Sequence, residues 1–257
     1  MAIEGRFNTD AGALDRRIQA HEKFGGKDLN QWIFHHLKPG RNMMILDLGC
    51  GTGKQTIPLA EIVGEKGRVT ALDISQEALE SLSANASEKG VRNIQILLGR
   101  FDELESLLKG ASFDRISSSY ALYYSERPEK VVKTIREQLK PEGIFFFCGP
   151  ARNNNLELKS FHYGIKGEPI PSQTDGTLFM EETGQQIARE VFSCVEVVFF
   201  ENPLRFDSAK ALYEYWSSYN LYEEEMNERF REAAAKHFKE KPVFETRKRV
   251  IGIVARI

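Results

Sequence analysis

The sequence predicts an α/β fold with a doubly wound, mostly parallel sheet. Short apolar runs and helical patterns alternate from about residue 45 to residue 148. The first run, ILDLGCGTG over residues 45–53, changes from apolar residues to alternating glycines and is followed by a helical pattern. The second run, RVTALD over residues 68–73, ends in an acid. Alternating strands and helices give a parallel sheet with helices on both faces, and such sheets bind small molecules at the carboxyl ends of their strands.

The composition limits the classes of partner. The chain has 257 residues, which suits one large domain, and 35 Lys and Arg against 37 Asp and Glu give a net charge of -2. A protein that binds nucleic acid non-specifically usually has a positive excess, so nucleic acid is disfavoured as a partner. No apolar run approaches membrane-spanning length and the N-terminus has no hydrophobic signal core, so we expect a cytoplasmic protein without a membrane partner. Three widely spaced cysteines are expected to be reduced thiols.

The glycine loop has two interpretations as a ligand site. A nicotinamide dinucleotide site requires G-x-G-x-x-G, whose third glycine would fall at Lys54. The chain instead reads G-x-G-x-G, with Asp47 two residues before Gly49. This pattern resembles motif I of the class I S-adenosylmethionine (SAM)-dependent methyltransferases. SAM presents an ammonium group that Asp47 would bind, directly or through water, and a carboxylate that the loop amides from Gly49 to Gly53 would approach.

Further motifs follow in the order that the family has them. Asp73 lies about 20 residues beyond the glycine loop, where nucleotide-binding folds place an acid on the ribose hydroxyls. GRFDEL at residues 99–104 stands where the family often has G-D-x-x-x-L, so Arg100 replaces the usual acid. The adenine contact stays open between Asp102, the Phe101 amide and stacking on the Phe101 ring. The resemblance implies SAM as cofactor, S-adenosylhomocysteine as product and these cofactor contacts: Asp47, Gly49, Cys50, Gly51, Gly53, Asp73, Ile74, Arg100, Phe101, Asp102, Ser118 and Ser119.

Two more segments support the resemblance. FDRISSS at residues 113–119 looks like the family's fourth strand, and LKPEG at residues 139–143 precedes a strand over 144–148, as it often does in the family. The resemblance covers about 60% of the chain and implies seven strands, the last one antiparallel. Neither the motif of many amino-methylating enzymes nor an acidic pair for magnesium is present, so we expect no metal. Cys148 is expected to be a buried structural thiol rather than a nucleophile.

The parts outside these motifs are expected to be helical additions. Residues 1–40 form an N-terminal arm or cap, with one helix through Leu14 and Ile18 and a second over 29–37 that Asp28 caps. Residues 41–257 form the SAM-binding domain. Its first helix ends near residue 63, and others are expected over 76–89 and 131–139.

The last third is expected to contain a lid. Residues 150–178 are polar and suggest a long loop, which is followed by a helix over 179–190 and a strand over 194–200. Residues 203–207 lead into a helix from Ser208, and a charged helix over 223–238 precedes a last strand over 250–255. The helical insertion at about 207–245 is the expected lid. Within it, Leu212, Tyr215, Trp216 and Tyr219 have helical spacing, which fits either core packing or a substrate pocket.

The resemblance predicts methyl transfer to a small metabolite by in-line displacement from a sulfonium, in a chain that works alone or as a homodimer. A general base is required only if the acceptor must lose a proton, and no sequence motif identifies one. Methylation of tRNA or protein, an NAD-dependent reaction and SAM binding without catalysis stay open. Candidate substrate contacts are aromatic residues after the fourth strand and on the lid: Tyr120, Tyr123, Tyr124, Trp216 and Tyr219.

Overall fold

The computed structural model describes residues 16, 19–21, 23–171 and 175–257. Seven strands form one sheet in the order β3-β2-β1-β4-β5-β7-β6. β7 is antiparallel to its neighbours β5 and β6, and the other pairs are parallel, which confirms the predicted architecture. The strands are β1 (Met44–Leu48), β2 (Arg68–Asp73), β3 (Ile94–Leu98), β4 (Phe113–Ser119), β5 (Leu139–Pro150), β6 (Cys194–Phe206) and β7 (Phe244–Arg256).

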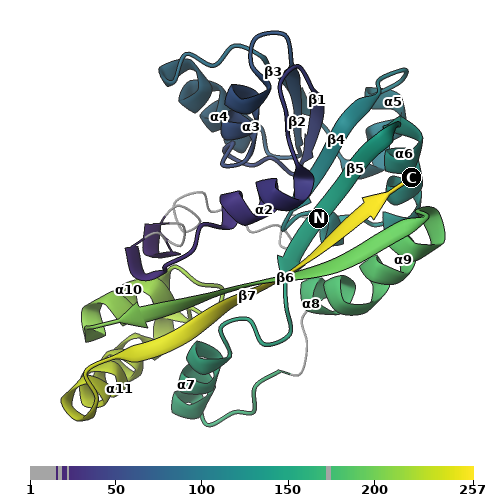
Figure 1. Cartoon of the computed structure of the whole chain (residues 1–257). Helices are drawn as coiled ribbons and strands as arrows, with labels where there is room; N and C mark the ends of the chain where they lie inside the picture. The colour runs from purple at the N-terminus through teal and green to yellow at the C-terminus, as the bar shows by residue number, and fades with distance from the viewer. Residues whose placement is uncertain (1–15, 17–18, 22, 172–174) are drawn as a thin grey trace.

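Helices cover both faces of the sheet (Figure 1). The α-helices are α2 (Leu29–Leu37), α3 (Thr56–Val63), α4 (Gln76–Glu88), α5 (Leu104–Leu107), α6 (Pro128–Gln138), α7 (Leu156–Lys166), α8 (Asp175–Leu178), α9 (Gly184–Val191), α10 (Ala209–Ser217) and α11 (Asn227–Glu240). Short 3-10 turns occupy Phe101–Glu103, Leu122–Tyr124 and Glu224–Met226, and a π-helical turn over Phe179–Thr183 joins α8 to α9. The expected helix through Leu14 and Ile18 lies largely outside the described residues.

Alternate side chains of β5 pack against the helices on the two opposite faces of the sheet. Successive strand residues point to opposite faces. Phe145 and Phe147 pack in the cluster with α5, α6 and α9, whereas Phe146 and Cys148 pack in the cluster with α2 and α3. All four side chains are buried, so β5, an interior strand of the sheet, is apolar on both faces. The chain changes faces between β1 and β4, and this switch point is where an open α/β sheet binds its ligand.

The last two strands are longer than the sequence suggested. β6 and β7 pair from Cys194 with Arg256 to Phe206 with Phe244, but β5 pairs with β7 only as far as Val250. Beyond that point β6 and β7 continue as a two-stranded ribbon, which runs out toward α10 and α11 in Figure 1. We expected the strand to end near residue 200, but it continues through Pro203. A proline is tolerated there because β6 is the edge strand of the sheet.

The ribbon has its own apolar core. Leu204, Phe206 and Phe244 of the ribbon pack with residues of α7, α10 and α11. We had expected a loop where α7 lies, because residues 150–178 are polar. The helix is stabilised by burying Leu158 in this cluster, so packing overrides the weak local signal. The ribbon with α7, α10 and α11 is called the ribbon module below.

The segment before α2 is fastened to the ribbon. The Asn202 side chain of β6 accepts hydrogen bonds from the backbone amides of Gly26 and Lys27, at 3.0 and 3.1 Å, and donates one to the Lys27 carbonyl. Asp28 then caps α2, as predicted, through an Oδ1 that accepts from the Asn30 amide at 2.7 Å. Within the described residues, no helix has both the length and the apolarity needed to cross a bilayer.

Candidate active site

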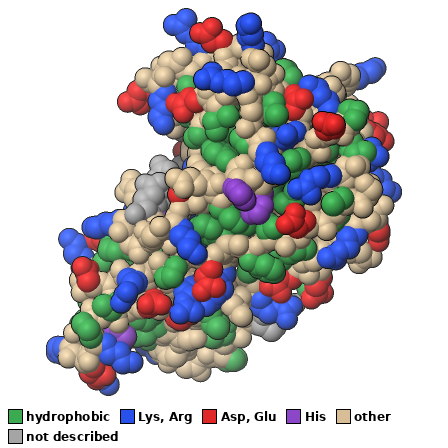
Figure 2. Space-filling view, viewed as in Figure 1, with side chains coloured by type: hydrophobic (Ala, Val, Ile, Leu, Met, Phe, Trp, Pro, Cys, Tyr) green, Lys and Arg blue, Asp and Glu red, His purple; other side chains and the backbone are tan. Residues whose placement is uncertain are grey.

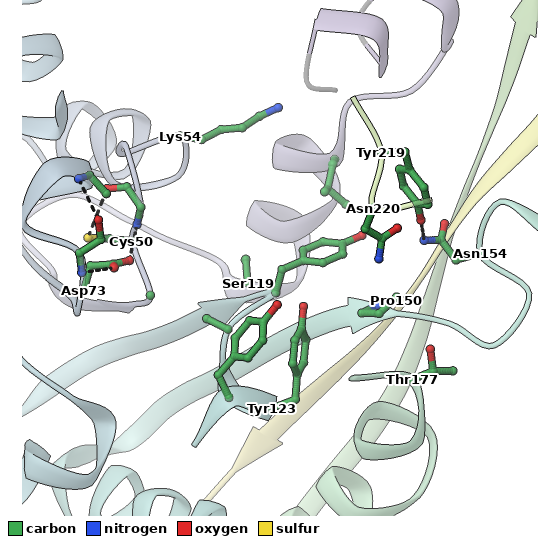
Figure 3. Close-up of a pocket in the computed structure, with 18 of the residues that line it drawn as sticks. Cys50, Lys54, Asp73, Ser119, Tyr123, Pro150, Asn154, Thr177, Tyr219 and Asn220 are labelled. Atoms are coloured by element: carbon green, nitrogen blue, oxygen red, sulfur yellow. Dashed lines mark hydrogen bonds between the residues drawn. The ribbon is translucent and has the colours of Figure 1, made fainter. Parts of the chain in front are cut away.

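One cavity of about 470 Å³ opens at the carboxyl ends of β1, β2 and β4. Figure 3 shows that residues from the glycine loop and β2, such as Cys50 and Asp73, lie at one end. Tyr219 and Asn154 lie at the other end, and Ser119 and Tyr123 lie between. The first end is called the loop end below and the second the ribbon end. A cavity of this size falls within the range of small-molecule sites.

The glycine loop uses its three glycines in different ways. All three have positive φ, at 72° for Gly49, 51° for Gly51 and 92° for Gly53, which side chains rarely adopt. A Cβ at Gly49 would lie 2.2 Å from the Cβ of Ala121, so that glycine allows close packing. At Gly51 a Cβ would meet nothing within 4 Å, and this residue lines the cavity. Gly51 therefore leaves open the space that a ligand would occupy.

Asp73 shapes the loop as well as lining the cavity. Its Oδ2 accepts a hydrogen bond from the Gly51 amide at 2.8 Å, and its Oδ1 accepts one from the Ser75 amide at 2.9 Å. A carboxylate has about four lone-pair positions, so each oxygen can accept another hydrogen bond from a ligand hydroxyl. The carboxylate thus fixes the glycine loop and still presents acceptors to the cavity.

Asp47 does not line the cavity. Its side chain is 2% exposed, and its oxygens accept hydrogen bonds from the hydroxyls of Thr56 at 2.7 Å and Ser117 at 2.8 Å. Burial raises the pKa of this carboxyl, against the opposite effect of the two hydroxyls. Asp47 therefore ties β1 to α3 and β4, and the structure does not support the expected direct contact with an ammonium group.

Two more of the expected cofactor contacts are also absent from the cavity wall. Gly53 faces α4, where a Cβ would lie 2.3 Å from the Leu82 side chain, so it serves the packing of the loop. Ser118 is fully buried within β4. The predicted cofactor contacts that the structure does bring together around the cavity are Gly49, Cys50, Gly51, Asp73, Ile74, Arg100, Phe101, Asp102 and Ser119.

The segment from Arg100 to Asp102 provides the wall beside Gly49. Arg100 lines the cavity and forms an ion pair with Glu126 at 3.2 Å. Asp102 accepts a hydrogen bond from the Ser125 hydroxyl at 3.3 Å. A Cβ on Gly49 would lie 3.3 Å from the Phe101 ring, so this ring stands directly beside the glycine loop. Ring stacking and a polar contact from Asp102 are both geometrically available to a bound base.

Tyrosines form the middle of the cavity. Tyr120, Tyr123 and Tyr124 line it, as expected for substrate candidates. Burial raises the pKa of Tyr120 and of Tyr123 well above the ordinary value, so both phenols stay protonated at neutral pH. Tyr120 has a φ of 58°, which is uncommon for a bulky residue and is typical of functional sites.

Cys148 is a buried thiol behind this wall, as expected. Burial raises its pKa to about 12, and its sulfur lies 3.7 Å from the Ser119 hydroxyl. It does not line the cavity. A thiol that stays protonated is a poor nucleophile, so the structure gives Cys148 a packing role.

The aromatic stripe on the lid divides between core and cavity. Trp216 is 0% exposed, stacks on Phe230 with ring centroids 4.1 Å apart, and donates a hydrogen bond to His162 Nδ1 at 3.2 Å. The interpretation of Trp216 as a substrate contact is therefore wrong, because the ring belongs to the core of the ribbon module. Tyr219, in the segment just after α10, does line the cavity.

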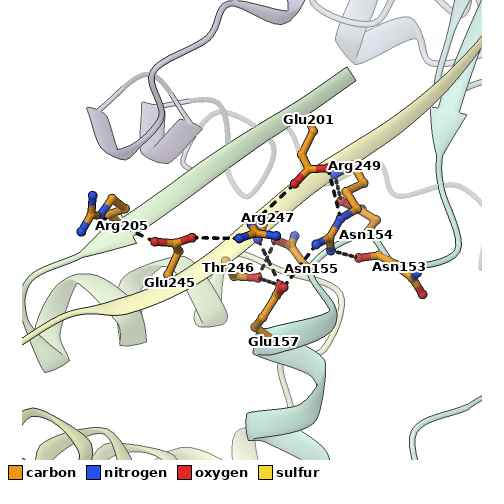
Figure 4. A network of polar contacts seen from close by, with 10 residues as sticks. All are labelled: Asn153, Asn154, Asn155, Glu157, Glu201, Arg205, Glu245, Thr246, Arg247 and Arg249. Carbon is orange, nitrogen blue, oxygen red and sulfur yellow. Dashed lines mark hydrogen bonds and ion pairs between the residues drawn. The ribbon is translucent and has the colours of Figure 1, made fainter. Parts of the chain in front are cut away.

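Asn154 and Asn155 connect the end of β5 with the ribbon module (Figure 4). The Asn154 side chain accepts from the Arg249 amide of β7 at 3.0 Å and donates to the Tyr219 hydroxyl at 3.2 Å. The Asn155 side chain donates to the Tyr215 hydroxyl at 2.8 Å. These amides hold Tyr219 and Tyr215 against the main sheet, a role that no local sequence motif indicates.

A basic run, Arg247 to Arg249, lies inside β7. Glu157 of α7 accepts from Thr246 at 3.1 Å and from the Arg247 amide at 3.2 Å, and pairs with Arg249 at 3.3 Å (Figure 4). Arg249 and Arg247 also pair with Glu201 of β6. Lys248, between them, lines the cavity instead. Successive side chains of a strand point to opposite faces, so the two arginines lie on one face of β7 and Lys248 on the other.

Several residues at and around the cavity were not predicted, because no local motif marks them. One of them is Asn30 of α2, which lies behind the glycine loop. Its side chain donates a hydrogen bond to the Lys54 carbonyl at 3.0 Å and accepts one from the Gln55 side chain at 2.9 Å. Over the described ranges, no cluster of three His, Cys, Asp or Glu side chains has the arrangement of a metal site. Cavity residues that the sequence did not single out include Lys54, Gln55, Asn154, Lys159, Tyr163, Thr177, Asn220 and Lys248.

Known proteins share the fold and part of the sequence of this chain. A family model described as a methyltransferase domain matches residues 39–192. A demethylmenaquinone methyltransferase of Lactococcus lactis is 39% identical over 101 residues, which are 39% of this chain and 39% of that protein. A nocamycin O-methyltransferase of Saccharothrix syringae is 31% identical over 113 residues, 44% of this chain and 39% of that protein.

A crystal structure of a SAM-dependent methyltransferase from Aquifex aeolicus has a TM-score of 0.56 at 16% identity, over 75% of this chain and 90% of that one, and shows the same fold. The chain spans about two fifths of the length of the two curated relatives above. The family model nevertheless covers more than half of the chain, including the strands and the glycine loop that form the loop end. The chain therefore belongs to the class I SAM-dependent methyltransferase family.

Proposed function

We propose that the protein transfers a methyl group from SAM to a small-molecule acceptor. The observation that carries this proposal is a cavity in which the family's cofactor loop faces a second wall made by the ribbon module. The loop end has an open space over Gly51, a carboxylate at Asp73 and a ring at Phe101. These residues suit the amino-acid, ribose and adenine parts of SAM respectively.

The residues of the chain would act by binding and orientation. SAM bound at the loop end supplies a methyl group on a sulfonium. Asp73 would accept hydrogen bonds from the ribose hydroxyls, while the loop amides approach the carboxylate of the amino-acid part. Tyr120 and Tyr123 stay protonated, so they would donate hydrogen bonds to the acceptor and offer ring faces to a cation. Holding both reactants in line is the main contribution expected of this protein.

The shape of the cavity favours a small acceptor over a polymer. The ribbon module and α8 contribute Tyr219, Tyr163 and Thr177 to its wall, so side chains from outside the motif-bearing strands enclose part of the ribbon end. On the face shown in Figure 2, basic and acidic side chains are interspersed, and no broad basic area marks a nucleic-acid track. The proposal includes a cytoplasmic location, since the described cysteines are all free thiols.

The decisive experiment has two measurements on the purified protein. Calorimetry should show binding of SAM and of S-adenosylhomocysteine, and NAD should not compete. A metabolite library should then contain an acceptor that gives release of S-adenosylhomocysteine. Binding without turnover on any acceptor would favour a SAM-binding regulator, whereas preferential binding of NAD would contradict the proposal.

Removal of the Asp73 carboxylate should weaken both SAM and S-adenosylhomocysteine. Asp73→Ala loses the hydrogen bonds to ribose and the bond that positions the Gly51 amide. Hydrogen bonds to a charged group are worth about 1.5 to 3 kcal/mol, so we expect a Kd about 10 to 150 times higher. Calorimetry on Asp73→Ala and on Asp102→Ala separates the two acids that line the loop end. An unchanged Kd for folded Asp73→Ala would reject the ribose assignment.

Tyr219 should affect the acceptor rather than the cofactor. Tyr219→Ala removes a ring from the ribbon end of the cavity and the hydroxyl that accepts from Asn154. We expect KM for the acceptor to rise, or kcat to fall, by about tenfold, with SAM affinity unchanged within about twofold. Tyr219→Phe keeps the ring and should retain most activity. A Tyr219→Ala variant that melts much earlier but turns over normally would show that this side chain only packs.

A further inference from the structure

The ribbon end of the cavity presents an ammonium group for which the described residues provide no partner. Lys159 and Tyr163 lie four residues apart on α7, on one side of the helix, and both line the cavity. The Lys159 ammonium makes no hydrogen bond or ion pair with the described chain. Burial lowers its pKa, and no acid in the described part of the chain opposes that effect.

The carboxylates that line the described part of the cavity stand elsewhere. They are Asp73, bonded to the glycine loop, and Asp102, bonded to Ser125, and both belong to the loop end. Lys248 of β7 lines the cavity as well, with its ammonium 5.6 Å from the centroid of the Tyr120 ring. Among the described residues, the ribbon end therefore carries positive groups and no acid of its own.

A second, independent observation comes from Tyr120. Its hydroxyl oxygen is buried and has no hydrogen-bond partner in the described chain. The Tyr120 amide donates to the Cys148 carbonyl at 2.8 Å, which fixes the residue in its left-handed conformation on the cavity wall. A buried hydroxyl without a partner is unfavourable, so this one is placed for a ligand atom. Since the phenol stays protonated, the atom that it would bind is an acceptor.

From these residues we infer that the methyl acceptor carries an anionic group, a carboxylate or a phosphate, which the Lys159 ammonium binds and toward which the Tyr120 hydroxyl donates. Rings of Tyr163 and Tyr219 line the ribbon end and that of Tyr123 the middle of the cavity, so we expect the acceptor to include a flat ring that packs against them. This inference rests on the proposed methyl transfer and specifies the class of its substrate.

The probes are pairs of small aromatic acids and their neutral amides, together with phenyl phosphate. Each is titrated by calorimetry into the protein saturated with S-adenosylhomocysteine. We expect acids of the set to bind at least about ten times tighter than their amides, and to bind more weakly as the salt concentration rises. The ratio between carboxylates and phenyl phosphate identifies which anion the site prefers.

Variants at Lys159 make the test specific. Lys159→Met should lose at least about tenfold in affinity for the acids, while its affinity for the amides and for SAM stays within about twofold. Lys159→Arg retains the charge and should recover most of the acid affinity. Lys236→Met, at an exposed lysine of α11, removes the same charge away from the cavity and should change nothing.

Three outcomes would overturn the inference: amides that bind as well as their acids, acids that bind Lys159→Met as well as the parent, or no acid that binds at millimolar concentration. The SAM titration keeps this result separate from the proposed function. A protein that binds SAM but prefers neutral probes loses only the anionic acceptor. A protein that does not bind SAM loses the proposed function itself.

Discussion

Gly51→Val should abolish cofactor binding while the protein stays folded. A Cβ at this position meets no protein atom within 4 Å but enters the cavity, where the backbone must approach the cofactor. The positive φ of 51° adds about 1 to 2 kcal/mol of strain for a residue with a side chain. We expect the Kd for SAM to rise at least about 100-fold, a loss of about 2.7 kcal/mol in calorimetry.

Gly90→Val provides a matched control for that result. Gly90 follows α4, has a φ of 68°, and its Cβ would also meet nothing within 4 Å, but it lies outside the cavity. Both variants therefore have similar backbone strain, and their melting temperatures should fall by similar amounts. Only Gly51→Val should lose SAM. Equal SAM affinities for the two variants would mean that the loop is only a turn.

Trp216→Ala should destabilise the protein by about 3 to 5 kcal/mol without changing SAM affinity in the folded fraction. The indole is fully buried, stacks on Phe230 and donates to His162, so truncation leaves a cavity and removes a hydrogen bond. For a chain of this length the melting temperature should fall on the order of 10 °C.

The comparison variant for Trp216 is Tyr222→Ala. Tyr222 packs edge-on against Trp216 with centroids 5.1 Å apart, but it is 40% exposed. We expect it to cost about 1 kcal/mol, as for a partly exposed contact. If Trp216→Ala melted like the parent and lost acceptor turnover, the indole would be a substrate contact after all.

The sequence predicted the motif-bearing half closely because local signals there agree with the packing. Leu29–Leu37 and Arg68–Asp73 have the predicted bounds. Each of these elements combines a cap, a glycine or an acid at its end with an apolar run of suitable length. The position of Asp73 on the cavity wall follows from the same rule, because a residue at the carboxyl end of a parallel strand reaches the site edge.

The ribbon module was predicted less well because its structure depends on distant contacts. Nothing near Pro203 indicates that a strand continues, and the pairing of Glu201 to Phe206 depends on residues 244–249, about 40 positions later. The expected direct contact between Asp47 and a ligand is not supported by the structure for a related reason. Its hydrogen-bond partner Ser117 lies 70 residues away, on a neighbouring strand. Sequence patterns indicate that an acid is present, but they do not indicate which hydroxyls will take up its oxygens.

The ribbon also makes part of the cavity wall exchangeable. Residues 207–243 lie between its strands, outside the glycine loop, Asp73 and the pairing of β5 with β7. Tyr215 and Tyr219 of this insertion accept hydrogen bonds from Asn155 and Asn154, which lie outside it. A graft of the insertion from a relative should therefore keep both tyrosines; on the proposed function it would change the acceptor wall next to Tyr219 and leave Lys159 and the methyl-donor end in place.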